Sequence, residues 1–230
     1  MTSPVVHLVG AGPGDPLLLT RRAARLLTEA DVIVADRHSA AAVLALARPG
    51  AERVYVGRTP EGPAWTTDAI ADLLAARARA GLVVARLKSG DPFVCSRGAE
   101  EAAALAARGV DVDVTPGVTA ATAAPLAAGL ARGTTVTVAS GDRDPYAAPV
   151  PWEALADPAA SLVVLTGRAQ QGAIAARLVE AGLPGETPAA VVHAAARPGT
   201  RVAATTLAGL GATRLPPPAA VVIGGDGAHP

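Results

Sequence analysis

The apolar stretch Val5–Val9 runs directly into the turn Gly-Ala-Gly-Pro-Gly-Asp-Pro at residues 10–16. Such a turn brings bare backbone close to a ligand, because glycine has no Cβ and tolerates positive φ. The pattern differs from the dinucleotide-binding fingerprint, which requires a third glycine three positions after the second. Asp15 stands at that position, and Pro16 follows it. We therefore expect a buried strand that ends in a turn suited to a nucleoside-type ligand rather than to a pyrophosphate on a helix start.

The composition favours sheets covered by alanine-rich helices. Half of the 230 residues are apolar but only 2% are aromatic, so the core must be built from Ala, Val and Leu. The length suffices for one large α/β domain or two small ones, each with its own core. The single cysteine, Cys95, excludes an internal disulfide and a multi-cysteine metal site. No spacing of His, Asp and Glu resembles a metal site, so we expect no metal.

Charge and hydropathy limit the kinds of partner that the protein is expected to bind. The formal net charge is zero, which argues against a nucleic-acid binder that works through bulk electrostatics. No apolar run approaches the length that spans a bilayer. The N-terminus enters a strand almost at once, without a charged lead and an apolar signal core. We expect a cytoplasmic protein with neither a membrane nor a nucleic-acid partner.

The first half of the chain alternates short β-branched runs with alanine- and leucine-rich windows. Near-continuous apolar strands separated by helices indicate a mainly parallel sheet that is covered on both faces. The expected strands are Val5–Val9, Asp31–Ala35, Arg53–Val56, Leu82–Leu87 and Val110–Val114. The expected helices are Arg21–Glu29, Ala40–Ala47, Thr67–Ala80 and Gly98–Arg108.

The character of the sequence changes near Pro116, after which small residues fill Thr119–Gly129 and predict a closely packed helix. The strands expected after it are Thr135–Ala139, Ser161–Leu165, Ala189–Val192, Arg201–Thr205 and Ala219–Ile223. Their spacing is less regular, which indicates a mixed sheet with some hairpins. The predicted fold class is α/β with two α/β domains. Residues 1–116 form the first, with a mainly parallel sheet, and residues 117–230 form the second, with a mixed sheet.

Polar residues follow two of the expected strands. Asp36 comes after the second strand, at the edge where open α/β sheets bind ligands. A carboxylate there can act as a general base, while a helix N-cap or an ion pair with Arg37 is the alternative interpretation. A second Gly-Asp-Pro turn follows another strand at residues 90–92. Either turn alone is ordinary turn chemistry, but together they predict two stretches of exposed backbone along one edge of a cleft.

The cysteine and the histidines carry weaker signals. Cys95 has Arg97 nearby, which can lower the pKa of a thiol, but no histidine is placed to pair with it, and we expect a packed thiol. His7 lies inside a strand and is expected to be structural. His38 and His193 follow strands and remain minor candidates for the site.

Several motifs, taken in order, resemble uroporphyrinogen-III C-methyltransferases of the tetrapyrrole methylase superfamily. They are Val-Gly-Ala-Gly-Pro-Gly-Asp-Pro-Leu-Leu-Leu-Thr (9–20), Ala-Asp-Val-Ile-Val-Ala-Asp-Arg (30–37), Tyr-Val-Gly-Arg (55–58), Arg-Leu-Lys-Ser-Gly-Asp-Pro-Phe-Val (86–94), Arg-Gly-Ala-Glu-Glu (97–101) and Thr-Pro-Gly-Val-Thr-Ala (115–120). The resemblance covers nearly the whole chain and is strongest before residue 120. It implies a tetrapyrrole methylase fold of two α/β domains, a homodimer, and S-adenosylmethionine bound in the cleft between the domains.

The resemblance also implies residue roles. The family's proton-accepting aspartate falls on Asp36, and its proton-donating lysine falls on Arg58. Because arginine stays protonated at almost any pH, Arg58 is better suited to bind substrate charge than to donate a proton. The contacts to S-adenosylmethionine fall on Pro13, Gly90, Asp91, Pro92, Thr119 and Ala120, with Thr166 in place of a methionine and Ala195 in place of a glycine.

Departures from the family pattern cluster where the acceptor would bind. Ser89 replaces the first glycine of a Gly-Gly-Asp-Pro motif, and Phe-Gly-Arg-Gly has become Cys95-Ser96-Arg97-Gly98. A Pro-Leu-Thr-His-Arg segment expected after Leu130 is shortened to Ala131-Arg132-Gly133. An acidic tetrapyrrole calls for cations that match carboxylates. The candidates for substrate binding are Arg37, Arg58, Lys88, Arg97 and Arg132, each with a solvated surface charge as its alternative.

The resemblance favours an S-adenosylmethionine-dependent C-methyltransferase that converts uroporphyrinogen III into precorrin-2 by two methylations. Two alternatives stay open. One is a methyltransferase of the same fold that acts on a different tetrapyrrole or on a small specialised metabolite. The other is a non-catalytic relative that binds S-adenosylmethionine. Dinucleotide-dependent reduction is disfavoured by the glycine pattern of residues 10–16.

Overall fold

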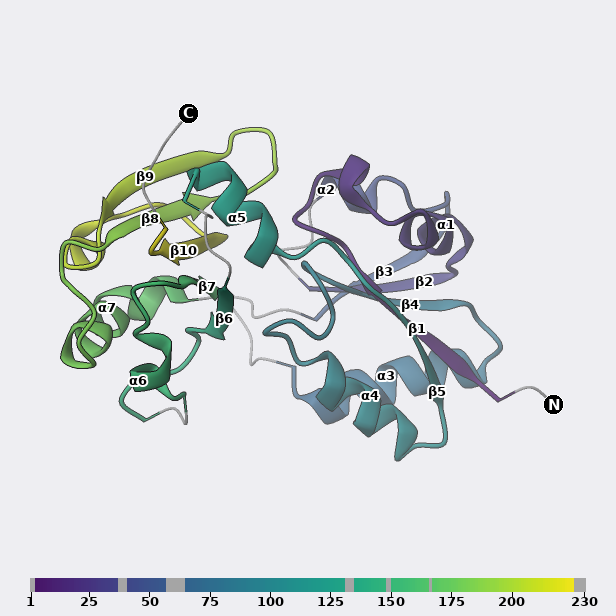
Figure 1. The fold of residues 1–230 in the computed structure, drawn as a ribbon. Coiled ribbons are helices and arrows are strands. Elements are labelled where there is room, and N and C mark those ends of the chain that lie inside the picture. The colour runs from purple at the N-terminus through teal and green to yellow at the C-terminus, as the bar shows by residue number, and fades with distance from the viewer. Residues whose placement is uncertain are drawn as a thin grey trace. The chain divides into compact units, whose positions relative to one another are not determined.

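The computed structural model describes residues 3–36, 41–56, 65–130, 135–147, 150–165 and 167–225. The chain divides into two compact units, Met1–Thr119 and Ala120–Pro230. Each unit contains one five-stranded sheet with helices packed on it (Figure 1). The predicted α/β fold class with two sheets is therefore confirmed. The division falls between residues 119 and 120, whereas the sequence predicted a division between residues 116 and 117.

The sheet of the first unit has the strand order β3-β2-β4-β1-β5, and every neighbouring pair is parallel. Its strands are β1 (Val5–Gly10), β2 (Val32–Ala35), β3 (Glu52–Tyr55), β4 (Val84–Lys88) and β5 (Asp111–Thr115). The helices are α1 (Arg21–Glu29), α2 (Ala41–Leu44), α3 (Thr67–Arg79) and α4 (Gly98–Ala106), with a short 3-10 helix at Pro16–Leu18. All of these strands and α-helices were predicted from the sequence, with bounds that differ by a few residues at most.

The first unit has three layers: α1 and α2 cover one face of the sheet, and α3 and α4 cover the other (Figure 1). Alternate residues of β4 point to opposite faces, as a strand requires. Ala85 packs with the residues of α1 and α2, whereas Val84 packs with those of α3 and α4. Arg86 and Lys88 share the parity of Val84. They consequently lie on the face that α3 and α4 cover.

The sheet of the second unit has the order β6-β7-β10-β8-β9. Its strands are β6 (Val136–Ser140), β7 (Ser161–Leu165), β8 (Pro188–His193), β9 (Arg201–Thr206) and β10 (Ala219–Ile223). Only the β6–β7 pair is parallel among the pairs that the described strands form, so the sheet is mixed, as expected. The helices are α5 (Ala120–Ala128), α6 (Trp152–Leu155) and α7 (Gln171–Glu180), with 3-10 helices at Gly167–Gln170 and Leu210–Ala212.

The sequence analysis predicted α5 but missed α6 and α7. In α7 the apolar spacing of Ile174, Ala175 and Leu178 places three side chains on one helical face, a signal that could have predicted this helix. The four-residue helix α6 begins directly after a proline-rich segment. It offers no comparable periodicity.

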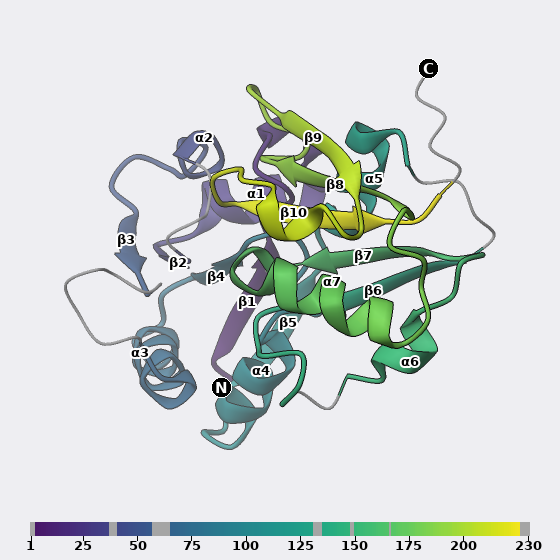
Figure 2. The same cartoon turned by 90° about the vertical axis from the view of Figure 1, so that its left-hand side faces the viewer.

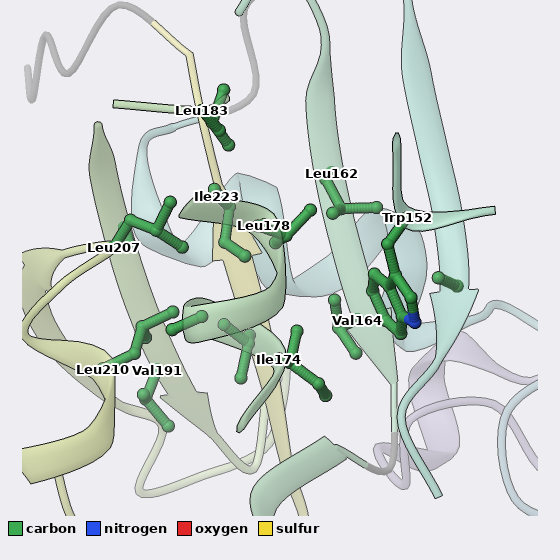
Figure 3. Packing of buried hydrophobic residues seen from close by; sticks show 14 residues of the cluster. Trp152, Leu162, Val164, Ile174, Leu178, Leu183, Val191, Leu207, Leu210 and Ile223 are labelled. Atoms are coloured by element: carbon green, nitrogen blue, oxygen red, sulfur yellow. The ribbon is translucent and has the colours of Figure 1, made fainter. Parts of the chain in front are cut away.

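The core of the second unit lies between its sheet and α7 (Figure 3). Ile174 and Leu178 of α7 pack there with Leu162 and Ile223 of the sheet. Trp152 joins this cluster, and its indole Nε1 donates a hydrogen bond of 3.0 Å to the carbonyl oxygen of Pro145. This bond anchors the chain that precedes α6 to the core. Figure 2 shows α6 and α7 in front of this sheet.

None of the helices formed by the described ranges is long and apolar enough to cross a lipid bilayer. The longest is α3, with 13 residues.

We predict that Leu178→Ala destabilises the second unit by about 2–5 kcal/mol, because Leu178 is fully buried and the substitution leaves a cavity. The matched control is Val179→Ala, one position along the same helix at 43% exposure, with an expected cost of about 0.5 kcal/mol or less. Urea unfolding followed by Trp152 fluorescence in a Trp65→Phe background measures both. Equal losses in the two variants would contradict the core position of Leu178.

Candidate functional site

Three loops meet at the carboxyl edge of the first sheet. Because β4, β1 and β5 are parallel neighbours, the loops that follow them, residues 89–93, 11–16 and 116–119, leave the sheet side by side. Gly12 and Gly90 form an antiparallel bridge, with N–H to O=C distances of 3.1 and 2.8 Å. The two Gly-Asp-Pro turns are thus joined directly, at the edge where open parallel sheets bind ligands.

The backbones at this edge approach so closely that only glycine fits. A Cβ on Gly117 would lie 2.2 Å from the carbonyl oxygen of Gly90, and one on Gly10 would lie 2.5 Å from the nitrogen of Gly117. Gly12 and Gly90 also have positive φ values of 64° and 68°, which favour glycine. The surface that this edge offers to a ligand is therefore built mainly from backbone.

The aspartates of the two turns shape the loops. Asp15 and Asp91 each accept a hydrogen bond from the backbone N–H two residues later, at 2.9 Å from Leu17 and 2.8 Å from Phe93. The second carboxylate oxygen of Asp91 accepts a further bond of 3.1 Å from the N–H of Gly117. Asp91 consequently ties the loop after β4 to the loop after β5. Both of its oxygens are bonded to backbone.

Asp36 follows β2 and is the exposed end of a chain of alternating charges. Its Oδ1 lies 2.6 Å from Nη2 of Arg86. Arg86 also pairs with Glu101, through Nε–Oε2 at 2.8 Å and Nη2–Oε1 at 3.0 Å. Glu101 in turn lies 2.6 Å from Nζ of Lys88. We call these four residues, Asp36, Arg86, Glu101 and Lys88, the ionic network. The charges of its two cations and two carboxylates cancel.

The interior of the ionic network is almost completely buried. The side chains of Arg86, Glu101 and Lys88 are 1%, 3% and 5% exposed, whereas that of Asp36 is 31% exposed. Burial by itself lowers the pKa of the Arg86 guanidinium, but the charges of Asp36 and Glu101 and their hydrogen bonds outweigh it and raise that pKa. Arg86 therefore stays a cation inside the unit, and it presents positive charge to Asp36.

The structure gives Asp36 a partner that neither local alternative named. The sequence left open a helix N-cap or an ion pair with Arg37. The described partner is Arg86, fifty residues away in the chain, and Arg37 lies outside the described residues. The general-base role of Asp36 stays a prediction, now attached to a carboxylate that a buried cation orients.

Two members of the ionic network were missed by sequence reasoning as site residues. Arg86 stands inside an otherwise apolar strand on the inward face, two positions after Val84. Glu101 precedes the buried Leu105 by one helical turn in α4. Glu101 and Leu105 therefore lie on the same face of the helix, toward the sheet. A charge at an inward strand position and a carboxylate on the buried stripe of the next helix were the available signals.

The other predicted substrate cations are placed differently from one another. The ammonium of Lys88 is bonded to Glu101 inside the unit. Arg97 precedes α4 with its side chain 65% exposed, and its described ion-pair partner is Glu100 at 3.8 Å. The two cations therefore have different carboxylate partners. Their roles in substrate binding stay predictions, and Arg58 and Arg132 lie outside the described residues.

The predicted contacts to S-adenosylmethionine fall into two groups. The loops of the first unit bring together Pro13, Gly90, Asp91, Pro92 and Thr119. Ala120 begins α5, and Ala195 follows β8 between two alanines with positive φ, 50° at Ala194 and 54° at Ala196. Positive φ is strained for residues other than glycine. Thr166 lies outside the described residues, and none of these contacts is tested by the geometry.

The histidines that the structure describes have internal partners. His7 Nδ1 lies 2.9 Å from Oδ2 of Asp113, and His193 Nδ1 lies 2.8 Å from the carbonyl oxygen of Pro216. His38 lies outside the described residues. In the part of the chain that is described, no three His, Cys, Asp or Glu side chains are grouped to hold a metal ion.

Residues 5–211 match the family described as Tetrapyrrole (Corrin/Porphyrin) Methylases. The siroheme synthase of Pseudomonas fluorescens (strain Pf0-1) is 42% identical over 215 residues, which cover 91% of this chain and 46% of that protein. The siroheme synthase of Azotobacter vinelandii is 42% identical over 210 residues, covering 89% of this chain and 45% of that protein. The chain thus spans about half the length of the curated relatives that it matches.

Solved structures show the same similarity over whole chains. The uroporphyrin-III C-methyltransferase of Thermus thermophilus, complexed with S-adenyl homocysteine, is 38% identical with a TM-score of 0.81, covering 95% of this chain and 91% of that one. A cobalt precorrin-4 methyltransferase is 26% identical with a TM-score of 0.81, covering 96% of this chain and 94% of that one.

We predict that Gly117→Ala opens the loop edge, because the added Cβ meets the carbonyl oxygen of Gly90. Overpacking against backbone costs about 1–3 kcal/mol, so the amides of Gly12 and Gly90 should exchange with deuterium about tenfold faster or more. Hydrogen–deuterium exchange measured by mass spectrometry tests this. Gly185→Ala is the control, since its Cβ would lie at an ordinary 3.5 Å from that of Ala208. Unchanged exchange in Gly117→Ala would refute the close-approach argument.

Proposed function

This chain belongs to the tetrapyrrole (corrin/porphyrin) methylase family, and from that premise we propose that it is an S-adenosylmethionine-dependent C-methyltransferase that methylates uroporphyrinogen III twice to give precorrin-2. The observation that carries the proposal is the Asp36 carboxylate, bonded to the buried Arg86 at the same sheet edge as the glycine loops. The Thermus thermophilus relative, whose structure holds S-adenyl homocysteine, supports both the donor and the acceptor.

The glycine loops fit a nucleoside-type ligand. A Cβ at Gly10 or Gly117 would clash with the backbone of the neighbouring loop, so glycine lets the loops lie directly against one another, and we propose that their backbone contacts the ligand. We propose that Pro13, Gly90, Asp91, Pro92 and Thr119 hold S-adenosylmethionine from these loops. From the second unit the resemblance adds Ala120, Thr166 and Ala195. S-adenosylmethionine, when bound, supplies an electrophilic methyl group on a sulfonium.

Asp36 has one task in this reaction. The acceptor carbon forms a bond to the methyl carbon while the carbon–sulfur bond breaks, and the electron pair of that bond stays on sulfur in S-adenosylhomocysteine. The methylated ring then loses a proton, which the Asp36 carboxylate accepts. A positioned carboxylate can serve as such a general base, and the buried Arg86 guanidinium, 2.6 Å away, holds the Asp36 carboxylate in place. Arg37, Arg58, Lys88, Arg97 and Arg132 remain the proposed partners of the acceptor carboxylates.

The wider setting is proposed on the same basis. Precorrin-2 would serve porphyrin-type biosynthesis that leads to siroheme or cobalamin, which the siroheme synthase relatives support. Because the chain covers 46% of that relative, only the methylation step is proposed for it. We further propose a homodimer in the cytoplasm that has a small acidic tetrapyrrole as its substrate and neither a membrane nor a nucleic-acid partner.

We predict two methyl additions when the protein is incubated anaerobically with S-adenosylmethionine and uroporphyrinogen III. Asp36→Ala should lower kcat/KM by about 10²–10⁴-fold through loss of the general base, while the affinity for S-adenosylmethionine changes little. Tetrapyrrole mass, S-adenosylhomocysteine release and isothermal titration calorimetry measure these quantities. Asp111→Ala, at the amino end of β5, is the control.

Full activity of Asp36→Ala would refute the role of Asp36. Binding of S-adenosylmethionine by the wild-type protein without any transfer to uroporphyrinogen III would refute the proposed acceptor and favour a different tetrapyrrole or a smaller metabolite. Failure to bind S-adenosylmethionine would refute the proposed donor site.

A further inference from the structure

We propose that Glu101 is a positioning residue for Asp36, acting through Arg86, and that Lys88 balances its charge. This inference rests on the proposed function, because it assumes that Asp36 accepts a proton. Glu101 contacts neither Asp36 nor the glycine loops in the described hydrogen bonds, so its effect must pass through the guanidinium that both carboxylates share.

The contacts of Arg86 show how Glu101 sets its orientation. The Nε and Nη2 atoms form a two-point pair with Glu101 at 2.8 and 3.0 Å, an arrangement that fixes the plane of a guanidinium. Nη1 donates to the carbonyl oxygens of Leu87 and Val34 at 3.2 and 3.4 Å. With the plane fixed in this way, Nη2 also reaches Asp36 at 2.6 Å. Without Glu101 the guanidinium loses the pair that holds Nη2 toward Asp36.

The charges of Glu101 and Lys88 act on Asp36 with opposite signs. Glu101 and Asp36 share the positive charge of Arg86, and Lys88, 2.6 Å from Glu101, offsets the negative charge of Glu101. Burial keeps solvent from screening these effects. Of the other described elements beside β2, β3 carries Tyr55 opposite Ala35. Removing the Lys88 cation therefore leaves the network one charge more negative, and removing the Glu101 carboxylate leaves it one charge more positive.

A purely structural role for the network is the competing explanation. Buried ion pairs are weak evidence for stability, since well-packed apolar residues of similar volume often serve as well or better. Here the buried charges end on one half-exposed carboxylate at the ligand edge, and Asp36 is the only member of the described network with substantial exposure. That arrangement is what a positioning role requires.

The test uses Lys88→Met, Glu101→Gln and the double variant, with kcat for methyl transfer to uroporphyrinogen III measured against pH. Lys88→Met removes a cation, so the acidic limb of the profile should move to higher pH by about half a unit to one unit. Glu101→Gln removes an anion, so the limb should move to lower pH by a similar amount. In Glu101→Gln, kcat at its plateau should also fall about 10–100-fold from lost positioning, with KM for S-adenosylmethionine unchanged.

The double variant separates charge from position. Its net charge near Asp36 equals that of the wild type, so its acidic limb should return toward the wild-type pH, while its plateau kcat stays low because the two-point pair is absent. It also keeps the buried charges balanced, which protects folding if Glu101→Gln alone is unstable. Glu100→Gln is the matched control, because Glu100 is the preceding residue of α4 and is 62% exposed; it should behave as the wild type.

Unshifted limbs, or shifts of the same sign in Lys88→Met and Glu101→Gln, would overturn the inference and leave a structural role. If the wild type fails to methylate uroporphyrinogen III, the proposed function fails by itself. The inference is then tested by the ¹³C NMR titration of the Asp36 carboxyl, assigned with Asp36→Asn. Opposite displacements in the two variants support it, and none would overturn it.

Discussion

The Arg86 guanidinium joins three parts of the first unit. It bonds the backbone of β2 at Val34, the carboxylate of α4 at Glu101, and Asp36 beyond the end of β2. Removing one partner from such a buried arrangement leaves an uncompensated charge, at a cost of about 3–5 kcal/mol. A strand that carries Arg86 on its inward face therefore requires a carboxylate on the covering helix, and Glu101 meets that requirement. The position of Asp36 follows from the same bonds.

Two kinds of chemistry share one edge of this sheet because its strands are parallel. The loops after β1, β4 and β5 contain no cation, and their two carboxylates, Asp15 and Asp91, are bonded to backbone N–H groups. The ionic network lies on the face toward α3 and α4 and supplies the charge. The glycines therefore determine the shape of this edge, and Asp36 supplies its exposed charge. This division suits a reaction in which one small group is transferred and one proton is removed.

The sequence alone was enough to predict the strands, but it did not predict the contacts between elements. All ten strands of the described residues were predicted, because short β-branched runs bounded by Gly, Pro and Asp indicate local structure. The pairing of Arg86 with Glu101 depends on how α4 packs on the sheet, and a local pattern does not contain that information. The same limit applies to Lys88, for which the sequence left open substrate binding and a solvated surface charge. Its position after an apolar strand is visible in the sequence, whereas its bond to Glu101 is not.

The backbone conformation explains one departure from the family pattern, the serine at position 89. Ser89 stands where the family has glycine, yet it is exposed and is absent from the described residues with positive φ, so the chain path there does not require glycine. Gly90, directly after it, has a φ of 68°, and Gly117 has no room for a Cβ. Glycine is thus present at positions 90 and 117, where the loops need it, and absent at position 89, where they do not. The serine changes the surface beside the loops and leaves their path intact, so its presence counts against neither the proposed donor site nor the role of Asp36.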